Sequence, residues 1–489
     1  MANKFTKHLI KACLLIVSIM YLNNTKAQIS LTSSAGSITS ASYTTLKTAF
    51  DSINSGAHQG AILLTINGTS TETASAVLNA SGAGLASFSS ISLTPTGGVA
   101  STITGSIAGH LIDLNGARNV TINGLNTGGN SLTISNTNIG ASSCIRFIND
   151  ASVNTITNCT ITGYTTSFGN VFFSTGNING NDSNTISNNN IGVAGSNFPI
   201  SGIYSLGTSA LIENNANIVT GNNIFDFFSA ALVTNGINVN SGNSNWTISN
   251  NKLYQTATRT YTTANVHNGI FVSSGAGYTI TGNNIGYANS LGTGIYTMAG
   301  TIATRFVGIN LAVGTTVVTS IQGNTVAAIS MATSSAASTA NGILCGINMS
   351  SGNVNVGTVT GNTIGANTGI NSIVATSTTT GGLVVGINSS STGAISIQNN
   401  TIGSLSSSGI TATIAGSITG VNISGVATSI NISSNTIGNA TSNNMRGGTS
   451  GLTTGSSLVS GINLPSTPTV ANITNNTIQN LSSFGTGTT

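Results

Sequence analysis

A seven-residue motif, Ile-x-x-Asn-x-Ile-Gly, recurs along most of this 489-residue chain and limits its fold more than any other feature. The first and sixth positions are aliphatic, and the fourth position is Asn in nine successive copies. These asparagines are Asn189, Asn222, Asn251, Asn283, Asn324, Asn362, Asn400, Asn435 and Asn476. A repeat of this kind is typical of a solenoid, because one unit cannot bury its apolar face until the next unit stacks on it.

A second motif, Gly-Ile or Gly-Val followed by a short apolar run, alternates with the first, from Gly202-Ile203 to Gly461-Ile462. Each unit therefore predicts three short strands, and their two-residue alternation places the isoleucines on one face. Stacked units bury that face and pair their backbones with the units above and below. We expect an all-β, right-handed, single-stranded parallel β-helix of about eleven turns over residues 109–489.

The repeated Asn lies between the second and third strands of each unit. A sharp bend there needs a residue that tolerates left-handed backbone angles, and Asn does so better than any residue except Gly. Stacked Asn side chains can also form hydrogen bonds along the helix, each worth a net ~1 kcal/mol. Both reasons predict a structural Asn ladder.

The segment 28–108 departs from the repeat, and we expect it to form an N-terminal cap and the first irregular turns. Leu46, Phe50 and Ile53 have helical spacing within TTLKTAFDSIN (44–54), which predicts a short amphipathic capping helix. A strand is expected at 61–66, and no comparable cap is visible at the C-terminus.

The repeats are separated by insertions of variable length. The surplus residues follow the Ile-Gly strand, as in 404–417. The insertions therefore lie at one corner of the helix, where solenoids often bind partners.

Residues 1–27 have the pattern of a secretory signal peptide, with a basic start, the apolar stretch ACLLIVSIMYL and a small-residue cleavage site. The apolar stretch is too short to span a bilayer, and no other segment predicts a transmembrane helix. Without the four lysines of this segment, basic and acidic residues balance, so nucleic acid binding is not expected. Three cysteines remain, Cys144, Cys159 and Cys345, which we interpret as buried free thiols.

The Asn and Gly-Ile motifs resemble the repeat of the pectin-lyase-like parallel β-helix superfamily, from about residue 110 to 480. That superfamily includes lyases, hydrolases and adhesins, so the resemblance implies the fold more strongly than a function. The stretches YTTLKTAFDSINSGAHQGAI, ASAVLNASG, LIDLNGARNVTINGLNTGGNSLTISN and TITNCTITG are similar to a group of mostly uncharacterised surface proteins. Those proteins belong to gram-negative bacteria that use the type IX secretion route, which implies a secreted or cell-surface location.

Acidic residues are scarce after the signal segment, and the last of them is Asp226. Glycoside hydrolysis needs a pair of carboxylates, so the chain after this residue offers no such site. Asp150, Asp182 and Glu213 precede the second strand in three consecutive units. They predict either an acidic column able to bind Ca²⁺, the one cofactor that the sequence suggests, or solvated loop acids.

Asp113 and Arg146 occupy the same place in adjacent Gly-Ile-type strands, so we expect them to form an ion pair on the outer face. His110 and His267 lie far apart in the sequence, with no matching nucleophile motif. They are interpreted as lone surface or turn histidines.

Aromatic residues concentrate between Tyr164 and Phe306. Two sets recur at similar places in adjacent units and are candidates for stacking on sugar rings, namely Trp246, Tyr278, Phe225, Tyr254 and Tyr287. Stacking of these rings inside the core is the alternative. A further row of asparagines in the Gly-Ile strands predicts a polar outer stripe that either presents amides to a glycan or keeps the face soluble: Asn310, Asn348, Asn388, Asn422 and Asn463.

The sequence leaves three functions open. The favoured hypothesis is a secreted or cell-surface, non-catalytic, adhesin-like protein that binds extracellular glycans weakly. The second is a polysaccharide lyase or glycoside hydrolase with its site in residues 110–230, where the acids of the helix lie. The third is a structural spacer within a longer surface protein.

Overall fold

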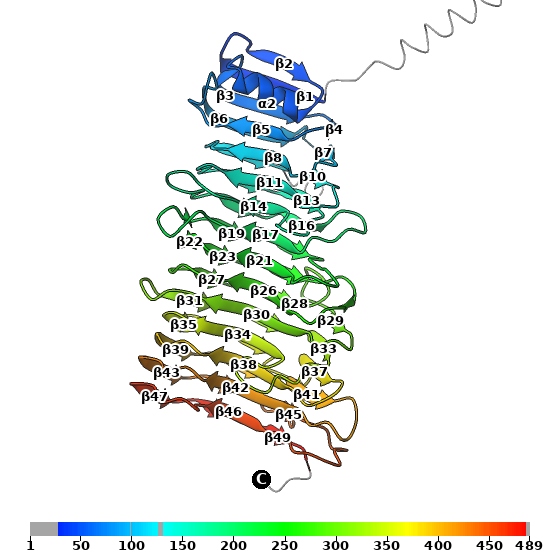
Figure 1. The fold of residues 1–489 in the computed structure, drawn as a ribbon, viewed down its shortest axis with the longest axis vertical. Helices are drawn as coiled ribbons and strands as arrows, with labels where there is room; N and C mark the ends of the chain where they lie inside the picture. Colours follow the sequence, from blue (N-terminus) through cyan, green and yellow to red (C-terminus); the bar gives the residue numbers. More distant parts are fainter. Residues whose placement is uncertain (1–27, 98, 126–130, 486–489) are drawn as a thin grey trace, which may run out of the picture.

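The computed structural model describes residues 28–97, 99–125 and 131–485, and the predicted signal segment 1–27 lies outside this part. The chain winds into one long stack of coils that runs from a capped N-terminal end to the last strands (Figure 1). Corresponding strands of successive coils pair in parallel, which gives three long sheets, here called A, B and C. The predicted parallel β-helix is therefore confirmed.

Sheet A contains the strands that precede the ladder Asn. In hydrogen-bonded order it consists of β2 (Ser40–Tyr43), β1 (Ile29–Ala35), β3 (Gln59–Ile66), β6 (Phe88–Pro95), β9 (Val120–Asn123), β12 (Thr155–Thr157), β15 (Thr185–Ser187), β19 (Ile218–Thr220), β23 (Thr247–Ser249), β27 (Thr279–Thr281), β31 (Thr319–Gln322), β35 (Val354–Val356), β39 (Ala394–Gln398), β43 (Ser429–Ser433) and β47 (Ala471–Thr474). Only the pairs β1–β2 and β1–β3 within it are antiparallel among the described strands.

Sheet B contains the strands that begin at or just after the ladder position. It consists of β4 (Thr69–Glu72), β7 (Ser101–Gly105), β10 (Leu132–Asn136), β13 (Cys159–Gly163), β16 (Asn190–Val193), β20 (Asn223–Phe225), β24 (Lys252–Tyr254), β28 (Asn284–Gly286), β32 (Thr325–Ala327), β36 (Thr363–Gly365), β40 (Thr401–Gly403), β44 (Thr436–Ile437) and β48 (Thr477–Ile478).

Sheet C contains the Gly-Ile strands. It consists of β5 (Ala76–Asn79), β8 (His110–Asn115), β11 (Ser143–Ile148), β14 (Val171–Phe173), β17 (Ser201–Ser205), β21 (Asn235–Val239), β26 (Val266–Val272), β30 (Arg305–Ala312), β34 (Leu344–Ser351), β38 (Leu383–Ser389), β42 (Ser417–Ile423) and β46 (Val459–Asn463). The run from β8 to β46 holds eleven of these described strands, one for each coil of the repeat.

The insertions between sheets B and C are not all loops. From β25 onward they pair into a fourth parallel sheet, here called D, which the sequence did not predict. Sheet D consists of β25 (Arg259–Thr260), β29 (Tyr296–Ala299), β33 (Ile329–Thr333), β37 (Ile373–Ser377), β41 (Leu405–Gly409), β45 (Met445–Gly447) and β49 (Leu481–Ser483). A further short pair, β18 (Asn214–Asn215) and β22 (Asn243–Ser244), lies between sheets C and A.

The predicted Asn ladder forms inside the stack, and the first eight of its nine members are buried. At Asn283, Oδ1 accepts hydrogen bonds from the backbone N–H and the side-chain amide of Asn251, at 3.0 and 2.9 Å. Nδ2 of Asn283 donates to Oδ1 of Asn324 at 2.9 Å and to the backbone carbonyl of Ile248 at 2.8 Å. The same arrangement repeats along the column, which confirms the predicted hydrogen bonding.

The other expected basis of the ladder, a left-handed backbone at the Asn itself, is wrong. The left-handed residue is the one just before it, such as Asn188 (φ 55°), Gly282 (φ 64°) or Asn399 (φ 55°). A Cβ at Gly282 would lie only 2.4 Å from Oδ1 of Asn250, so this coil favours glycine at the bend. The ladder position is thus held by its side-chain amide, and the bend by its neighbour.

The core is the continuous aliphatic column between the three sheets, and its main members are the isoleucines of the repeat. In-register pairing, as between Ile156 and Ile186, stacks identical side chains on one another.

The three cysteines of the described residues, Cys144, Cys159 and Cys345, are buried free thiols, as predicted, and burial raises the pKa of each to about 12. Among the described residues, no helix is long and apolar enough to cross a membrane.

The predicted capping helix is present as α2 (Leu46–Asn54), which lies across the N-terminal end of the stack (Figure 1). Leu46, Phe50 and Ile53 are buried as expected, and Thr45 with Thr48 forms a capping box at its start. This helix closes the apolar end of the first coil.

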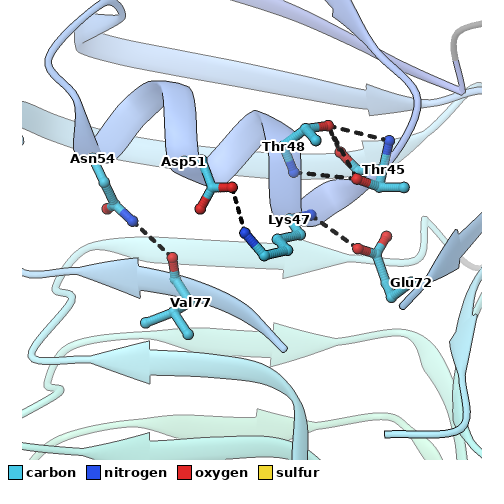
Figure 2. A network of polar contacts seen from close by, with 7 residues as sticks. All are labelled: Thr45, Lys47, Thr48, Asp51, Asn54, Glu72 and Val77. Atoms are coloured by element: carbon cyan, nitrogen blue, oxygen red, sulfur yellow. Dashed lines mark hydrogen bonds and ion pairs between the residues drawn. The ribbon is translucent and has the colours of Figure 1, made fainter. Parts of the chain in front are cut away.

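A carboxylate that the sequence did not single out secures the capping helix. Glu72, on β4, accepts hydrogen bonds from the backbone N–H groups of Leu46, at 2.7 Å, and Lys47, at 3.0 Å. Figure 2 shows the second of these bonds. At the other end of the helix, Nδ2 of Asn54 donates to the backbone carbonyl of Val77 at 2.8 Å. The side chains of the fold therefore hold both ends of α2 against the first coil.

Candidate functional site

Four side chains form a row on the outward face of sheet C. Asp113, Arg146, Phe172 and Tyr204 lie opposite one another in β8, β11, β14 and β17. Their inward neighbours, such as Ile145, are in the core. Because successive residues of a strand point to opposite faces, these four side chains must face outward. The row thus brings a charged pair and two rings together.

Asp113 and Arg146 form the predicted ion pair, with two parallel hydrogen bonds. Nε of Arg146 donates to Oδ1 of Asp113 at 2.9 Å, and Nη2 donates to Oδ2 at 2.6 Å. The side chains of Arg146 and Asp113 are 23% and 9% exposed, respectively, so the pair is largely shielded from water. Such fork geometry engages one whole edge of the guanidinium and leaves the pair with no net charge.

His110 joins this row and does not stand alone as predicted. Its ring lies 5.9 Å from that of Phe168 and 5.7 Å from that of Phe172, measured between centroids. Nδ1 of His110 lies 2.7 Å from Oγ of Ser143. Burial, and then the nearby charge of Arg146, lower the pKa of His110 to about 4. The ring is therefore neutral at pH 7.

Phe168 covers this part of the outer face. It precedes β14 and stacks on Phe172, with centroids 4.4 Å apart and planes at 12°. Tyr204 approaches both rings, at 6.1 Å from Phe168 and 5.5 Å from Phe172. Phe172 is buried beneath its neighbours, while Phe168 and Tyr204 remain partly exposed.

A shallow hollow adjoins these rings, on the connections between sheets B and C. Its lining residues are Tyr164, Thr165, Thr166, Ser196, Asn197, Phe198, Ile200, Phe228, Ser229 and Ala230. One loop links the hollow to the outer row, since Thr165 lines the hollow and its Oγ1 accepts a hydrogen bond from the backbone N–H of Phe168 at 3.0 Å. Two rings meet in it edge to face, Phe198 and Phe228, with centroids 5.7 Å apart.

A buried cation lies against these two rings. The guanidinium carbon of Arg259 is 4.5 Å from the centroid of Phe198 and 5.3 Å from that of Phe228. Arg259 forms an ion pair with Asp226, and both side chains are almost fully buried. Its Nε also donates to Oε1 of Gln255 at 2.6 Å. The pair fixes the rings from below and adds no net charge.

We call the resulting surface the aromatic patch, defined by the rings of Tyr164, Phe168, Phe172, Phe198, Tyr204 and Phe228. It combines partly exposed ring faces with hydroxyl and amide groups, such as those of Thr166, Ser196 and Asn197. Apolar surfaces with a few fixed polar groups are typical of small-molecule sites.

Two of the predicted stacking residues lie in the core. Trp246 and Tyr278 are 0% exposed and face inward from sheet A. Nε1 of Trp246 donates to the backbone carbonyl of Asn214 at 2.8 Å, and the hydroxyl of Tyr278 donates to that of Asn243, also at 2.8 Å. Because these rings are fully buried, they cannot contact a sugar, and the alternative interpretation is correct for both.

In the other predicted set, Phe225 and Tyr254 lie on sheet B, and Tyr287 directly follows β28 of that sheet. Phe225 and Tyr254 stack with centroids 5.4 Å apart and planes at 11°. Tyr254 is only 8% exposed, whereas Phe225 and Tyr287 are half-buried. Gly192, in the preceding coil, lies under the Phe225 ring, where a Cβ would be 2.7 Å away. This stack is thus mostly committed to packing between coils.

The three acids of the predicted column lie near one another, but each already accepts hydrogen bonds from the coil that follows its own. Asp150 accepts hydrogen bonds from four successive backbone N–H groups of the loop 177–180, at 2.8 to 3.2 Å. Burial alone would raise the pKa of Asp150, but these four donors lower it below its ordinary value. Asp150 therefore organises a loop.

The remaining two acids are engaged in the same way. Asp182 accepts from the backbone N–H of Asn215 at 2.8 Å, and Glu213 accepts from the hydroxyl of Ser244. Burial raises the pKa of Asp182, the N–H of Asn215 opposes this, and the charges of Asp150 and Glu213 add to it. In the described ranges, no group of three or more His, Cys, Asp or Glu side chains is placed to hold a metal ion.

The predicted outer Asn stripe forms a second ladder instead of a freely exposed surface. The amide of Asn388 donates to Asn348 at 2.7 Å, and that of Asn422 donates to Asn388 at 2.7 Å. These three asparagines are buried, and only Asn310 and Asn463 are partly or fully exposed. Their amides are therefore largely satisfied within the protein.

Sequence reasoning missed the aromatic patch because most of its rings lie in connections that do not follow the repeat. Phe172 and Tyr204 had a usable signal, since each directly follows the inward aliphatic residue of a sheet C strand. Phe168, Phe198 and Phe228 had none. Comparisons with models of known protein families and with curated proteins found no match.

Proposed function

We propose that this chain is a secreted or cell-surface, non-catalytic protein that binds carbohydrate through the aromatic patch. The observation that carries the proposal is the group of partly exposed ring faces beside the hydroxyl and amide groups of Thr166, Ser196 and Asn197. Aromatic faces pack against the apolar faces of sugar rings, and polar neighbours fix their orientation. The fold and the repeat also support membership of the pectin-lyase-like superfamily, and the N-terminal stretches support surface export.

The carboxylates near the patch favour binding over hydrolysis. On the outward rows of β8, β11, β14 and β17, the one carboxylate is Asp113, and Arg146 engages both of its oxygens. Hydrolysis uses two carboxyl groups that flank the scissile bond, one of them free to act as an acid. His110 is neutral at pH 7 and half-buried. We therefore rank the lyase or hydrolase hypothesis second.

Isothermal titration of the mature protein against neutral and acidic oligosaccharides tests the proposal. Phe168→Ala and Tyr204→Ala each remove a partly exposed ring, and we expect each to weaken binding about tenfold or more. Tyr287→Ala is the matched control, because this half-buried tyrosine lies outside the patch. Absence of any glycan binding, or equal losses in all three variants, would contradict the proposal and favour a structural spacer.

The same preparations separate binding from catalysis. Incubation with the polysaccharides that bind should release neither reducing ends nor unsaturated products. If product appears and Asp113→Ala or Asp150→Ala abolishes it, the protein is an enzyme, and the proposal of a non-catalytic function is wrong.

A further inference from the structure

The charges beside the aromatic patch are paired in a way that bears on ligand class. Arg146 lies next to Phe172 in register on the outward row, and its guanidinium is held by Asp113 through both carboxylate oxygens. Arg259 lies against Phe198 and Phe228 and is held by Asp226. Each of these two cations next to the patch thus has its own carboxylate.

This pairing contrasts with what an acidic glycan would need. Uronic acid and sulfate groups are bound mainly by charge-assisted hydrogen bonds from arginine or lysine. The described strands β8, β11, β14 and β17 carry no Lys or Arg on their outward rows besides Arg146. Asp113 already occupies the guanidinium edge that would receive a ligand carboxylate.

The neighbouring ionisable group does not restore a positive charge. His110 has a pKa of about 4, because burial and the charge of Arg146 both oppose its protonation. At neutral pH the surface around the rings of Phe168 and Phe172 is therefore uncharged overall.

We propose that Asp113 is a specificity-determining residue that masks Arg146, and that the patch consequently takes neutral oligosaccharides and discriminates against uronates. This inference rests on the proposed carbohydrate-binding function and names the ligand class of the same site. It predicts that removal of the negative charge of Asp113 shifts the binding preference of the patch toward uronates, while the contacts of the patch to a neutral sugar stay the same.

The experiment compares a β-1,4-linked glucose hexamer with the same hexamer oxidised to the uronate at C6, by titration of the full mature chain. We expect the wild-type protein to bind the neutral hexamer at least as tightly as the acidic one. Asp113→Asn should raise the ratio of uronate to neutral affinity about tenfold or more, the usual effect of one charge-assisted hydrogen bond. This gain should shrink as NaCl is added.

Asp51→Asn is the matched control, because it frees Lys47 on α2, in the N-terminal cap and outside the patch, and should leave the ratio unchanged. Arg146→Gln keeps Asp113 and should lower the ratio, which gives a second test if Asp113→Asn does not fold. Preference of the wild type for the uronate, or a folded Asp113→Asn with an unchanged ratio, would overturn the inference alone. Failure of the wild type to bind any oligosaccharide would instead overturn the proposed function.

Discussion

Replacement of one interior member of the Asn ladder is the sharpest test of how this solenoid is held together. Asn283 lies in the middle of the ladder and is almost completely buried. We consider Asn283→Leu, which keeps the number of side-chain heavy atoms but removes both polar groups, and Asn283→Ala, which also leaves space. Both changes leave the preceding left-handed residue, Gly282, untouched.

The magnitude follows from the four hydrogen bonds that the side chain makes. Two come from Asn251, one goes to the carbonyl of Ile248, and one goes to Oδ1 of Asn324. At a net ~1 kcal/mol each, their loss costs about 4 kcal/mol of unfolding free energy. The backbone N–H of Asn251 then has no acceptor in the core, which adds about 1–2 kcal/mol. We therefore expect about 5–6 kcal/mol for either variant.

Urea denaturation followed by the fluorescence of Trp246 measures this loss locally. Trp246 is the single tryptophan of the chain, it is buried, and it directly precedes β23, in the coil next to that of Asn283. Hydrogen exchange at the amide of Asn251 gives a second readout, because a solenoid can open part by part. Thr281→Ala, on the outward face of β27, is the control and should change stability by less than about 0.5 kcal/mol.

The outcome for Asn283→Leu decides between two explanations of the ladder. If the side chain merely fills space, leucine should cost less than about 1.5 kcal/mol, and alanine should cost clearly more. If the hydrogen bonds dominate, the two variants should be similar. A leucine variant within about 1 kcal/mol of the wild type would refute the conclusion that hydrogen bonding by the Asn283 side chain stabilises the stack.

Three further predictions concern other parts of the fold. Glu72→Gln weakens the hydrogen bonds from the backbone N–H groups of Leu46 and Lys47 at the start of α2, and it should destabilise the cap by about 2–3 kcal/mol. Hydrogen exchange of those two amides should become faster. Unchanged exchange would contradict the conclusion that Glu72 holds the helix start. Gly282 and Asn399 both have left-handed backbone angles, which glycine adopts freely and alanine does not. In urea denaturation, Gly282→Ala should therefore cost at least about 1 kcal/mol, and Asn399→Gly only a few tenths. Equal losses would contradict this explanation. Burial lowers the pKa of His110 to about 4, so protonation of this residue favours the unfolded chain. The unfolding free energy should therefore be highest above pH 6.5 and should fall by about 2–3 kcal/mol as the pH drops from 6.5 to 4. In acid denaturation, His110→Gln should flatten this pH dependence.

The parallel β-helix could be predicted because its determinants are local and periodic. Each copy of the motif supplies the isoleucines and the buried amide of one coil, and the register between coils follows from pairing like with like. The capping helix was predictable for the same reason, since Leu46, Phe50 and Ile53 mark one helical face. The hydrogen bonds from Glu72 to the start of α2 could not be predicted, because they join residues about 25 positions apart that share no sequence pattern.

Side-chain placement limited the prediction of the candidate site. Trp246 and Tyr278 occupy equivalent sites in successive coils, and a repeated position is as consistent with a core stack as with an outer one. The ring of Phe168 reaches the outer face only because its loop folds over β14, which no periodicity describes. The ion pair of Asp113 and Arg146 was predictable, because strand register alone brings the two residues together.

Sheet D divides the connections between sheets B and C into two kinds, with different freedom to change. Before β25, the connections that carry Tyr164, Phe198 and Phe228 make no continuous ladder with their neighbours, so a substitution there affects its own coil and the adjacent surface. From β25 onward, the connections pair strand to strand, and a change in one must suit the coils on both sides. The connections of the N-terminal half can therefore accept substitutions one at a time, whereas those of the C-terminal half must change together.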